Sequence, residues 1–188
     1  MGLSIKTCYT VKIQKQLDAT QDKTTEKLNI ARKRAVDSRL MRQTSLICLE
    51  ALKFCVSVIS EEWDTIMGVE SKLRKRLIDT LVHRTKTAAP KYPEFDLKFP
   101  KMPGYTRRAI IADAFGMVKS YRSNHKNWKE TPPMERGAEP TLGIPSRYEL
   151  TFYDQERKMS CLADSQIGLK LYNGKTWNWY YFQIRPSD

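Results

Sequence analysis

The sequence has few of the side chains that enzymes use for covalent or metal chemistry. Of its 188 residues only two are histidines and four are cysteines, and no two cysteines are spaced as C-x-x-C. No H-E-x-x-H or G-x-S-x-G motif is present, and none of the eight glycines falls in a phosphate-binding loop. These absences argue against a zinc site, a nucleotide-binding loop and nucleophilic catalysis. We therefore predict no catalytic residue, no metal and no cofactor, and interpret His83 and His125 as satisfied surface histidines.

Acidic residues give one weak alternative to that prediction. Glu61 and Asp64 lie one turn apart in a predicted helix and could face the same cation. Because Glu62 stands beside them, a solvated acidic helix face is the simpler interpretation.

Glycine and proline are absent from residues 3–67, so the usual helix breakers are missing there. From Thr25 the apolar residues recur at steps of three and four, which predicts one or two amphipathic helices, with Asp37–Arg39 as a candidate break. Further helices are predicted around Leu73–Val82, after a stop at Gly68, and over Tyr105–Asn127. The proline-rich segments are predicted to be an ordered connector and a flexible loop, at residues 90–104 and 128–145.

Strand patterns lie at the two ends of the sequence. Thr7–Gln14 has the alternation of a half-buried strand, and three aromatic or branched segments near the C-terminus are strand candidates. These segments are Tyr148–Tyr153, Ile167–Tyr172 and Thr176–Ile184, with Asn173-Gly174 as a type I′ hairpin turn. The sequence therefore predicts an α+β fold in which the first strand joins the C-terminal hairpins in a small antiparallel sheet.

The sequence also shows no secretion signal and no membrane span. Its most apolar stretch, around Cys55–Ile59, is interrupted by Ser57. The four cysteines are scattered, so we predict reduced thiols and a cytoplasmic protein without a membrane partner.

Positive charge is abundant and unevenly placed. The formal net charge is +12, from 33 basic and 21 acidic residues. The excess lies before residue 137, since residues 137–188 carry six basic and six acidic side chains. Such a charge indicates a polyanionic partner, either nucleic acid or an anionic membrane surface, that meets the helical part of the chain.

The predicted helix after Pro103 carries the clearest candidate binding surface. At 100° per residue its basic side chains fall within about 60° of arc, in a stripe that can follow a phosphate backbone. The alternative is an ordinary solvated amphipathic helix. The stripe consists of Arg108, Lys119, Arg122 and Lys126, with Tyr105 and Trp128 as flanking stacking surfaces.

Three other residues have two open interpretations. Arg107 lies at the edge of the apolar arc and either forms a structural ion pair or reaches a phosphate. Trp177 and Trp179 share one face of the last predicted strand and either stack on bases or pack in the core of the hairpin.

Residues 92–128 resemble the N-terminal half of TnpB-like proteins, the transposon-encoded RNA-guided nucleases related to type V CRISPR effectors. The resemblance extends more loosely to Ile184, and before Tyr92 it rests only on the order of a strand and then helices. The positions that carry it are Phe99-Pro100, Pro103, Tyr105, Arg107-Arg108 and Ser120-Tyr121.

The resemblance implies a helical recognition-type domain at residues 19–136, inserted in a small wedge-like β-sheet or barrel. That sheet would consist of a first wedge strand within residues 1–18 and β-hairpins within residues 137–188. The family's RuvC-like nuclease domain would follow residue 188, so the resemblance implies a nucleic-acid-binding part of a transposase-related mobile-element protein. Its expected partner is RNA or an RNA–DNA duplex, alone or with a separately encoded nuclease half. The alternatives are a protein-interaction module with a basic helical face and a non-functional remnant of a mobile element.

Overall fold

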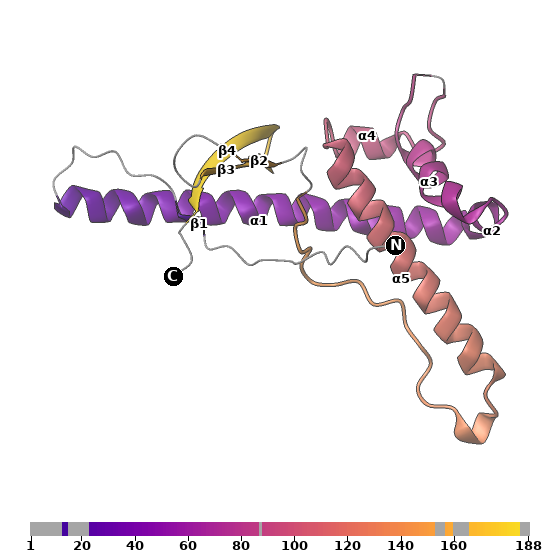
Figure 1. Cartoon of the computed structure of the whole chain (residues 1–188). Helices are drawn as coiled ribbons and strands as arrows, with labels where there is room; N and C mark the ends of the chain where they lie inside the picture. Colours follow the sequence, from indigo (N-terminus) through magenta and orange to yellow (C-terminus); the bar gives the residue numbers. More distant parts are fainter. Residues whose placement is uncertain (1–12, 15–22, 87, 153–156, 160–165, 185–188) are drawn as a thin grey trace, which may run out of the picture.

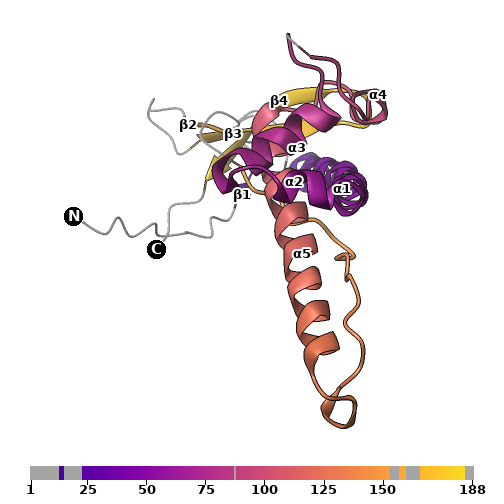
Figure 2. The same ribbon diagram turned by 90° about the vertical axis from the view of Figure 1, so that its right-hand side faces the viewer.

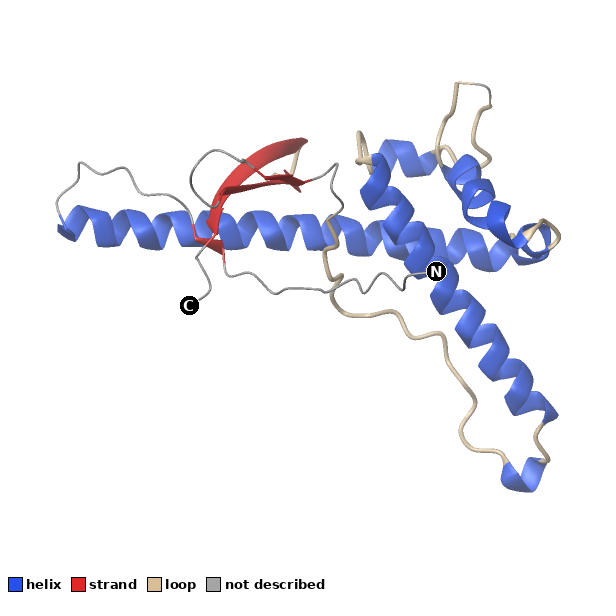
Figure 3. Cartoon of the chain, viewed as in Figure 1, coloured by secondary structure: helices blue, strands red, loops and turns tan. Residues whose placement is uncertain are grey.

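The structure of the chain, a computed structural model, describes residues 13–14, 23–86, 88–152, 157–159 and 166–184. Figure 3 shows that helices dominate and that the strands gather in one sheet. The fold is therefore α+β, as predicted. The elements are β1 (Ile13–Gln14), α1 (Lys23–Glu61), α2 (Trp63–Met67), a 3-10 turn (Ser71–Leu73), α3 (Arg74–Val82), α4 (Glu94–Lys98), α5 (Gly104–Glu130), a second 3-10 turn (Pro133–Glu135), β2 (Arg157–Met159), β3 (Gln166–Tyr172) and β4 (Trp177–Ile184).

Helix α1 runs the length of the molecule without interruption (Figure 1). Its 39 residues correspond to about 58 Å at 1.5 Å per residue. Of the two alternatives, one helix or two, the structure shows one, without a break at Asp37–Arg39. None of these residues is glycine or proline, and each lowers helix propensity by less than about 1 kcal/mol.

Part of α1, Ser38–Glu61, is long and apolar enough to cross a membrane on length and composition alone. Half of its most apolar window is buried inside the fold, and Cys55 and Ile59 are completely buried. This is the pattern of a core helix in a soluble protein.

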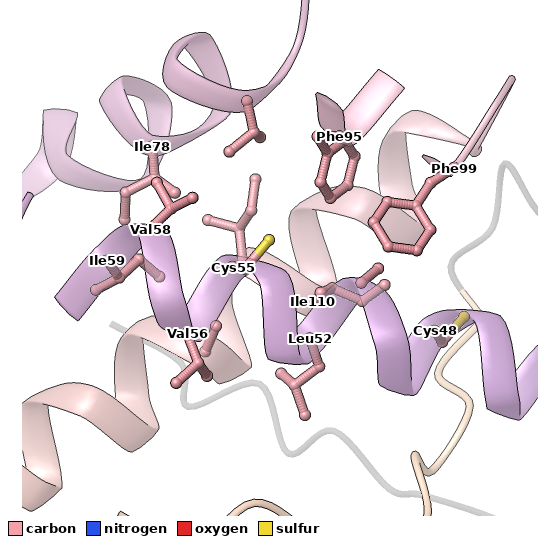
Figure 4. Packing of buried hydrophobic residues seen from close by; sticks show 14 of the residues in the cluster. Cys48, Leu52, Cys55, Val56, Val58, Ile59, Ile78, Phe95, Phe99 and Ile110 are labelled. Carbon is pink, nitrogen blue, oxygen red and sulfur yellow. The ribbon is translucent and has the colours of Figure 1, made fainter. Parts of the chain in front are cut away.

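The main hydrophobic core forms where α1, α3, α4 and the first half of α5 meet (Figure 4). Leu52 and Ile59 of α1, Ile78 of α3 and Ile110 of α5 are all at most 1% exposed. Phe95 of α4 completes it, so the proline-rich segment that was predicted to be non-helical contains one short helix, which anchors it to the core. Removing a large side chain from such a site typically costs about 2–5 kcal/mol.

The sheet packs on the N-terminal half of α1. Its strand order is β1-β4-β3-β2, and all pairs are antiparallel. A second core cluster joins it to the helix through Leu40 of α1 and Leu171 and Phe182 of the sheet. Thr44 fixes the helix and the hairpin together, since its Oγ1 donates to the Leu40 carbonyl at 2.8 Å and accepts from the Tyr172 amide at 2.9 Å.

The pairing of the first strand with the C-terminal strands is confirmed for the residues that the structure describes. Ile13 pairs with Ile184, and Gln14 pairs with Gln183. The remainder of the predicted first strand, residues 7–12, lies outside the described residues. Among the described strands, β1 and β2 occupy opposite edges of the sheet, so no pairing closes it into a barrel.

The hairpin between β3 and β4 forms as predicted, but its turn is different. Tyr172 pairs with Trp177, and the Asn173 amide donates to the Thr176 carbonyl, so Gly174 and Lys175 are the central residues. Gly174 has a φ of 94°, the sign that a type II′ turn requires at its first central position. The predicted type I′ turn at Asn173-Gly174 is wrong, because the Asn173 side chain instead accepts hydrogen bonds from the amides of Lys175 and Thr176.

Tyr148–Phe152 is not a strand, and Tyr153, the last residue of that predicted strand, lies outside the described residues. Tyr148 is anchored by helices instead. The Ser45 hydroxyl of α1 donates to the Tyr148 carbonyl at 2.6 Å, and the Tyr148 hydroxyl donates to Asp113 of α5 at 2.8 Å. These tertiary contacts replace the strand pairing that the alternation of apolar residues predicted.

Helix α5 crosses α1 and then extends away from the rest of the molecule (Figure 2). All residues from Lys119 to Arg147 are described, and none of them is buried. We call residues 119–145 the arm, and the described remainder from residue 38 onward the body. The arm consists of the last three turns of α5 and the loop that returns along it (Figure 1).

Candidate nucleic-acid interface

The four basic side chains of the predicted stripe are all exposed on α5. From Arg108 to Lys126 they cover about 27 Å of helix axis at 1.5 Å per residue. The apolar residues beside them, among them Ile111 and Val118, are buried in the core. The amphipathic pattern therefore places the stripe in solvent, where a polyanion can reach it.

Two of the arginines are held by aromatic rings. The Arg108 guanidinium lies 4.2 Å from the centroid of the Tyr105 ring, and its Nε donates to the Gly104 carbonyl. The Arg122 guanidinium lies 5.0 Å from the Trp63 ring and donates to the Ser60 carbonyl at 3.1 Å. Tyr105 therefore supports a cation of the stripe through a cation–π contact.

The two lysines are held more loosely. Lys126 lies 3.7 Å from Glu130, an exposed contact that contributes little to stability. Lys119 makes no hydrogen bond or ion pair with any residue that the structure describes. Both ammonium groups are thus available to bind phosphate without breaking a strong internal interaction.

A hollow of about 540 Å³ lies on the arm beside the stripe. Two of its lining residues, Arg122 and Lys126, were predicted from the sequence, and two more, Lys129 and His125, were not. The helical period could have identified Lys129, since it follows Lys126 by three residues. The hollow thus combines three cations with the aromatic rings of Tyr121 and His125.

Trp128 is engaged inside the arm. Its Nε1 donates to the Gly137 carbonyl at 2.8 Å, and the Arg136 guanidinium lies 5.0 Å from its ring. The ring of His125 also stacks with that of Trp128, with 5.9 Å between the centroids, and His125 contacts Glu139 at 2.9 Å. Trp128 thus attaches the loop to α5, which leaves its ring less accessible to a base than predicted.

Arg107 lies inside the fold. It is 9% exposed, and its Nε donates to Asp79 of α3 at 2.7 Å. Of the two alternatives that the sequence left open, the structure favours the structural ion pair. We therefore do not include Arg107 in the proposed interface.

The two tryptophans of β4 differ in exposure. Trp177 is 6% exposed and packs in the main core beside Tyr172, so its ring is not accessible for stacking. Trp179 is half-buried, with Lys170 above its ring at 6.0 Å. Of these two rings, only that of Trp179 reaches solvent, and it lies far along the chain from the stripe.

Glu62 is not the solvated residue that the sequence suggested. It is 8% exposed and accepts hydrogen bonds from Lys91 and from the Tyr92 hydroxyl. The hydrogen bond from Lys91, and then that from Tyr92, lower the pKa of Glu62, while the pKa of Lys91 is raised by the same contact. Glu61 and Asp64 are exposed, and no cluster of three or more candidate metal ligands occurs within the described residues.

The cysteines of α1 have a structural role. Cys48 and Cys55 are both fully buried, and neither forms a disulfide within the described residues. Burial, and to a lesser extent the carboxylate of Asp79, raises the pKa of Cys55 to about 12. Its thiol stays protonated and unreactive at neutral pH.

The fold and the candidate interface together define an α+β protein with a projecting basic helix. Residues 24–173 match the Aq_aa04 family. Because this range is well over half of the 188 residues, the chain belongs to the Aq_aa04 family. The matched range begins in α1 and ends after β3, so it includes the whole arm. No curated protein and no solved structure matches the chain.

Proposed function

We propose that the chain binds nucleic acid through the arm and the adjoining stripe, with RNA or an RNA–DNA duplex as the ligand. The observation that carries this proposal is the hollow on the arm, where Arg122, Lys126 and Lys129 lie beside the half-buried rings of Tyr121 and His125. Residues 116–130 contain these cations and Lys119 against a single acid, Glu130. Such a surface binds phosphates by charge and shape, with little preference for base sequence.

The stripe is matched to a backbone rather than to base edges. Its cations are spread over about 27 Å, and neighbouring phosphates on one strand lie about 6–7 Å apart along an extended chain, so several contacts can form together. Arg108 and Arg122 are already oriented by Tyr105 and Trp63, which reduces the entropy lost on binding.

Salt dependence tests this proposal. We expect the affinity for a labelled RNA–DNA duplex, measured by fluorescence anisotropy, to fall with a log–log slope of about −3 to −4 if four phosphates are neutralised. Replacing Lys119 or Lys126 by alanine should lower the magnitude of the slope by nearly one each. Lys53→Ala is the matched control, because Lys53 is an exposed cation of the body that pairs with Glu50. If the stripe is replaced by alanine with the fold intact and the affinity is unchanged, the proposal is wrong.

The resemblance to TnpB-like proteins extends the proposal. In this extended proposal the chain binds RNA or an RNA–DNA duplex without cleaving it, with wedge-like strands beside a recognition-type helical body. A separately encoded nuclease half then carries out the cleavage. The Aq_aa04 match does not depend on that resemblance. Sequencing RNA that co-purifies with the protein tests it, and so does an assay of the purified chain for cleavage with magnesium or manganese. Cleavage that is lost in Glu61→Gln or Asp64→Asn would contradict the non-catalytic part.

The compartment is part of the same proposal. Buried thiols at Cys48 and Cys55 fit a reducing environment, so we propose the cytoplasm. The alternative function, a protein-interaction module, predicts an acidic protein partner and no co-purifying nucleic acid. The ratio of absorbance at 260 and 280 nm of the purified protein separates these two functions.

A further inference from the structure

A second concave surface lies on the body, away from the hollow of the arm. It is a groove of about 840 Å³ between one side of α1 and the segment Ser146–Leu150. This volume is within the range of binding sites for small ligands and short peptides. None of the stripe residues lines it, so it requires a separate explanation.

The α1 wall of the groove includes an exposed apolar side chain. Leu46 is 51% exposed, and beside it Leu49 is 6% exposed. A half-exposed leucine in a concave site gains free energy when another apolar group covers it, by about 25 cal/mol for each Å² removed from water. The groove therefore favours a ligand with a leucine-like side chain.

The polar part of the groove is positive. Arg42 of α1 and Arg147 of the opposite wall are exposed, and neither guanidinium has a hydrogen-bond or ion-pair partner within the described part of the chain. Glu149 is the one acid among the lining residues. Guanidinium groups bind carboxylates in bidentate pairs, so two unpaired arginines favour an acidic ligand.

The two walls are fixed relative to each other. Ser45 donates to the Tyr148 carbonyl across the base of the groove, and the buried Tyr148 side chain is in turn held by Asp113 of α5. The groove is thus formed before any ligand arrives, which favours affinity. The backbone of Arg147 and Glu149 makes no hydrogen bond with other described residues, so it can pair with a peptide main chain.

From these contacts we propose that the groove binds a short acidic peptide segment of a partner protein, with a leucine-like side chain on Leu46 and carboxylates on Arg42 and Arg147. A nucleic acid fits the groove less well. The one aromatic lining residue, Tyr148, is 6% exposed and offers no stacking surface. This inference does not depend on the nucleic-acid function of the arm.

The test uses a short fluorescein-labelled peptide that alternates glutamate and leucine, titrated with the full chain. We expect saturable binding that weakens by at least about tenfold when Arg42 and Arg147 are both replaced by glutamate. Replacing leucine by serine in the peptide should weaken binding to a similar degree. Arg39→Glu is the matched control, because Arg39 is exposed on α1 but does not line the groove, and it should leave the affinity unchanged.

Three results would overturn the proposal. One is the absence of saturable binding at about 1 mM peptide. Another is unchanged affinity in the double variant when circular dichroism shows an intact fold. The third is a loss of RNA affinity in that variant as large as the loss of peptide affinity, which would make the groove part of a nucleic-acid surface. Lys119→Glu together with Lys126→Glu separates the two sites, since it should weaken RNA binding alone.

Discussion

The body and the arm use the same kinds of side chain for different purposes. In the body, the two buried charged side chains are paired, Arg107 with Asp79 and Glu62 with Lys91. In the arm, the two lysines of the stripe are exposed. Lys126 has only a weak contact with Glu130, and Lys119 has no hydrogen bond or ion pair with a described residue. The comparison teaches that charge count alone does not identify a binding surface. Burial and pairing decide which cations remain for a partner.

Neighbouring arginines give the sharpest test of this difference. Arg107→Ala leaves the Asp79 carboxylate without its partner near the core, so we expect a loss of about 3 kcal/mol in the free energy of unfolding. Arg108→Ala removes an exposed cation and should change it by less than about 0.5 kcal/mol. Urea denaturation measures both. An equal loss of unfolding free energy in the two variants would show that the paired Arg107 and the exposed Arg108 contribute alike to the fold.

The pH dependence of stability tests the pairing of Glu62. Because its pKa is lowered from 4.5, its contribution is complete above that pH and is lost as pH falls through the lowered pKa. The hydrogen bond to Glu62 raises the pKa of Lys91 above 10.5. Burial, and then the hydrogen bond to Glu62, raises the pKa of Tyr92 above 10.0. Their contribution is complete below those values and is lost as pH rises through the raised ones.

Glu62→Gln should therefore be less stable than the natural protein between about pH 5 and pH 10, and the difference should narrow towards both extremes. Urea unfolding at a series of pH values measures it. Glu94→Gln is the control, since Glu94 is exposed. A constant difference at all pH values would mean that Glu62 contributes through packing rather than through its charge.

Within the arm, Trp128 is expected to act locally. Trp128→Ala removes the hydrogen bond to Gly137 and the contacts with Arg136 and His125, so the loop should detach from α5. Hydrogen exchange should become faster in residues 131–140, while the global free energy of unfolding changes by less than about 1 kcal/mol. Loss of protection in the body as well would show that the arm is not energetically separate.

The smallest stability effect should come from the stripe itself. Lys119→Ala should leave the free energy of unfolding within about 0.5 kcal/mol of the natural protein, because Lys119 is exposed. Its RNA affinity should nevertheless fall. A variant that lost stability and affinity together would indicate that Lys119 supports the fold rather than the ligand.

Local sequence patterns predict most of the helices of this fold, but they do not predict its polar contacts. The period of Ile110, Ile111 and Val118 predicts α5 and its buried side correctly, since these residues need only a neighbouring apolar surface. By contrast, Asp79 and Arg107 lie 28 residues apart in the chain, and Glu62 lies 30 residues from Tyr92. No local pattern identifies such partners.

The candidate site shows the same division. Exposure of Lys119, Arg122 and Lys126 follows from the helical period, but the engagement of Trp128 depends on a loop that returns to α5. The strand prediction near Tyr148 failed for a similar reason. Its alternating apolar residues found partners on two helices instead of on a strand.

The continuity of α1 has a consequence for folding. This one helix carries Leu40 and Thr44 under the sheet and Leu52 to Ile59 in the helical core, with no glycine or proline between them. Unwinding α1 beneath the sheet therefore leaves a new helix end, with unpaired backbone groups, next to the helical core. We expect the sheet and the helical core to melt in a single cooperative transition, with the same midpoint by circular dichroism and by tryptophan fluorescence.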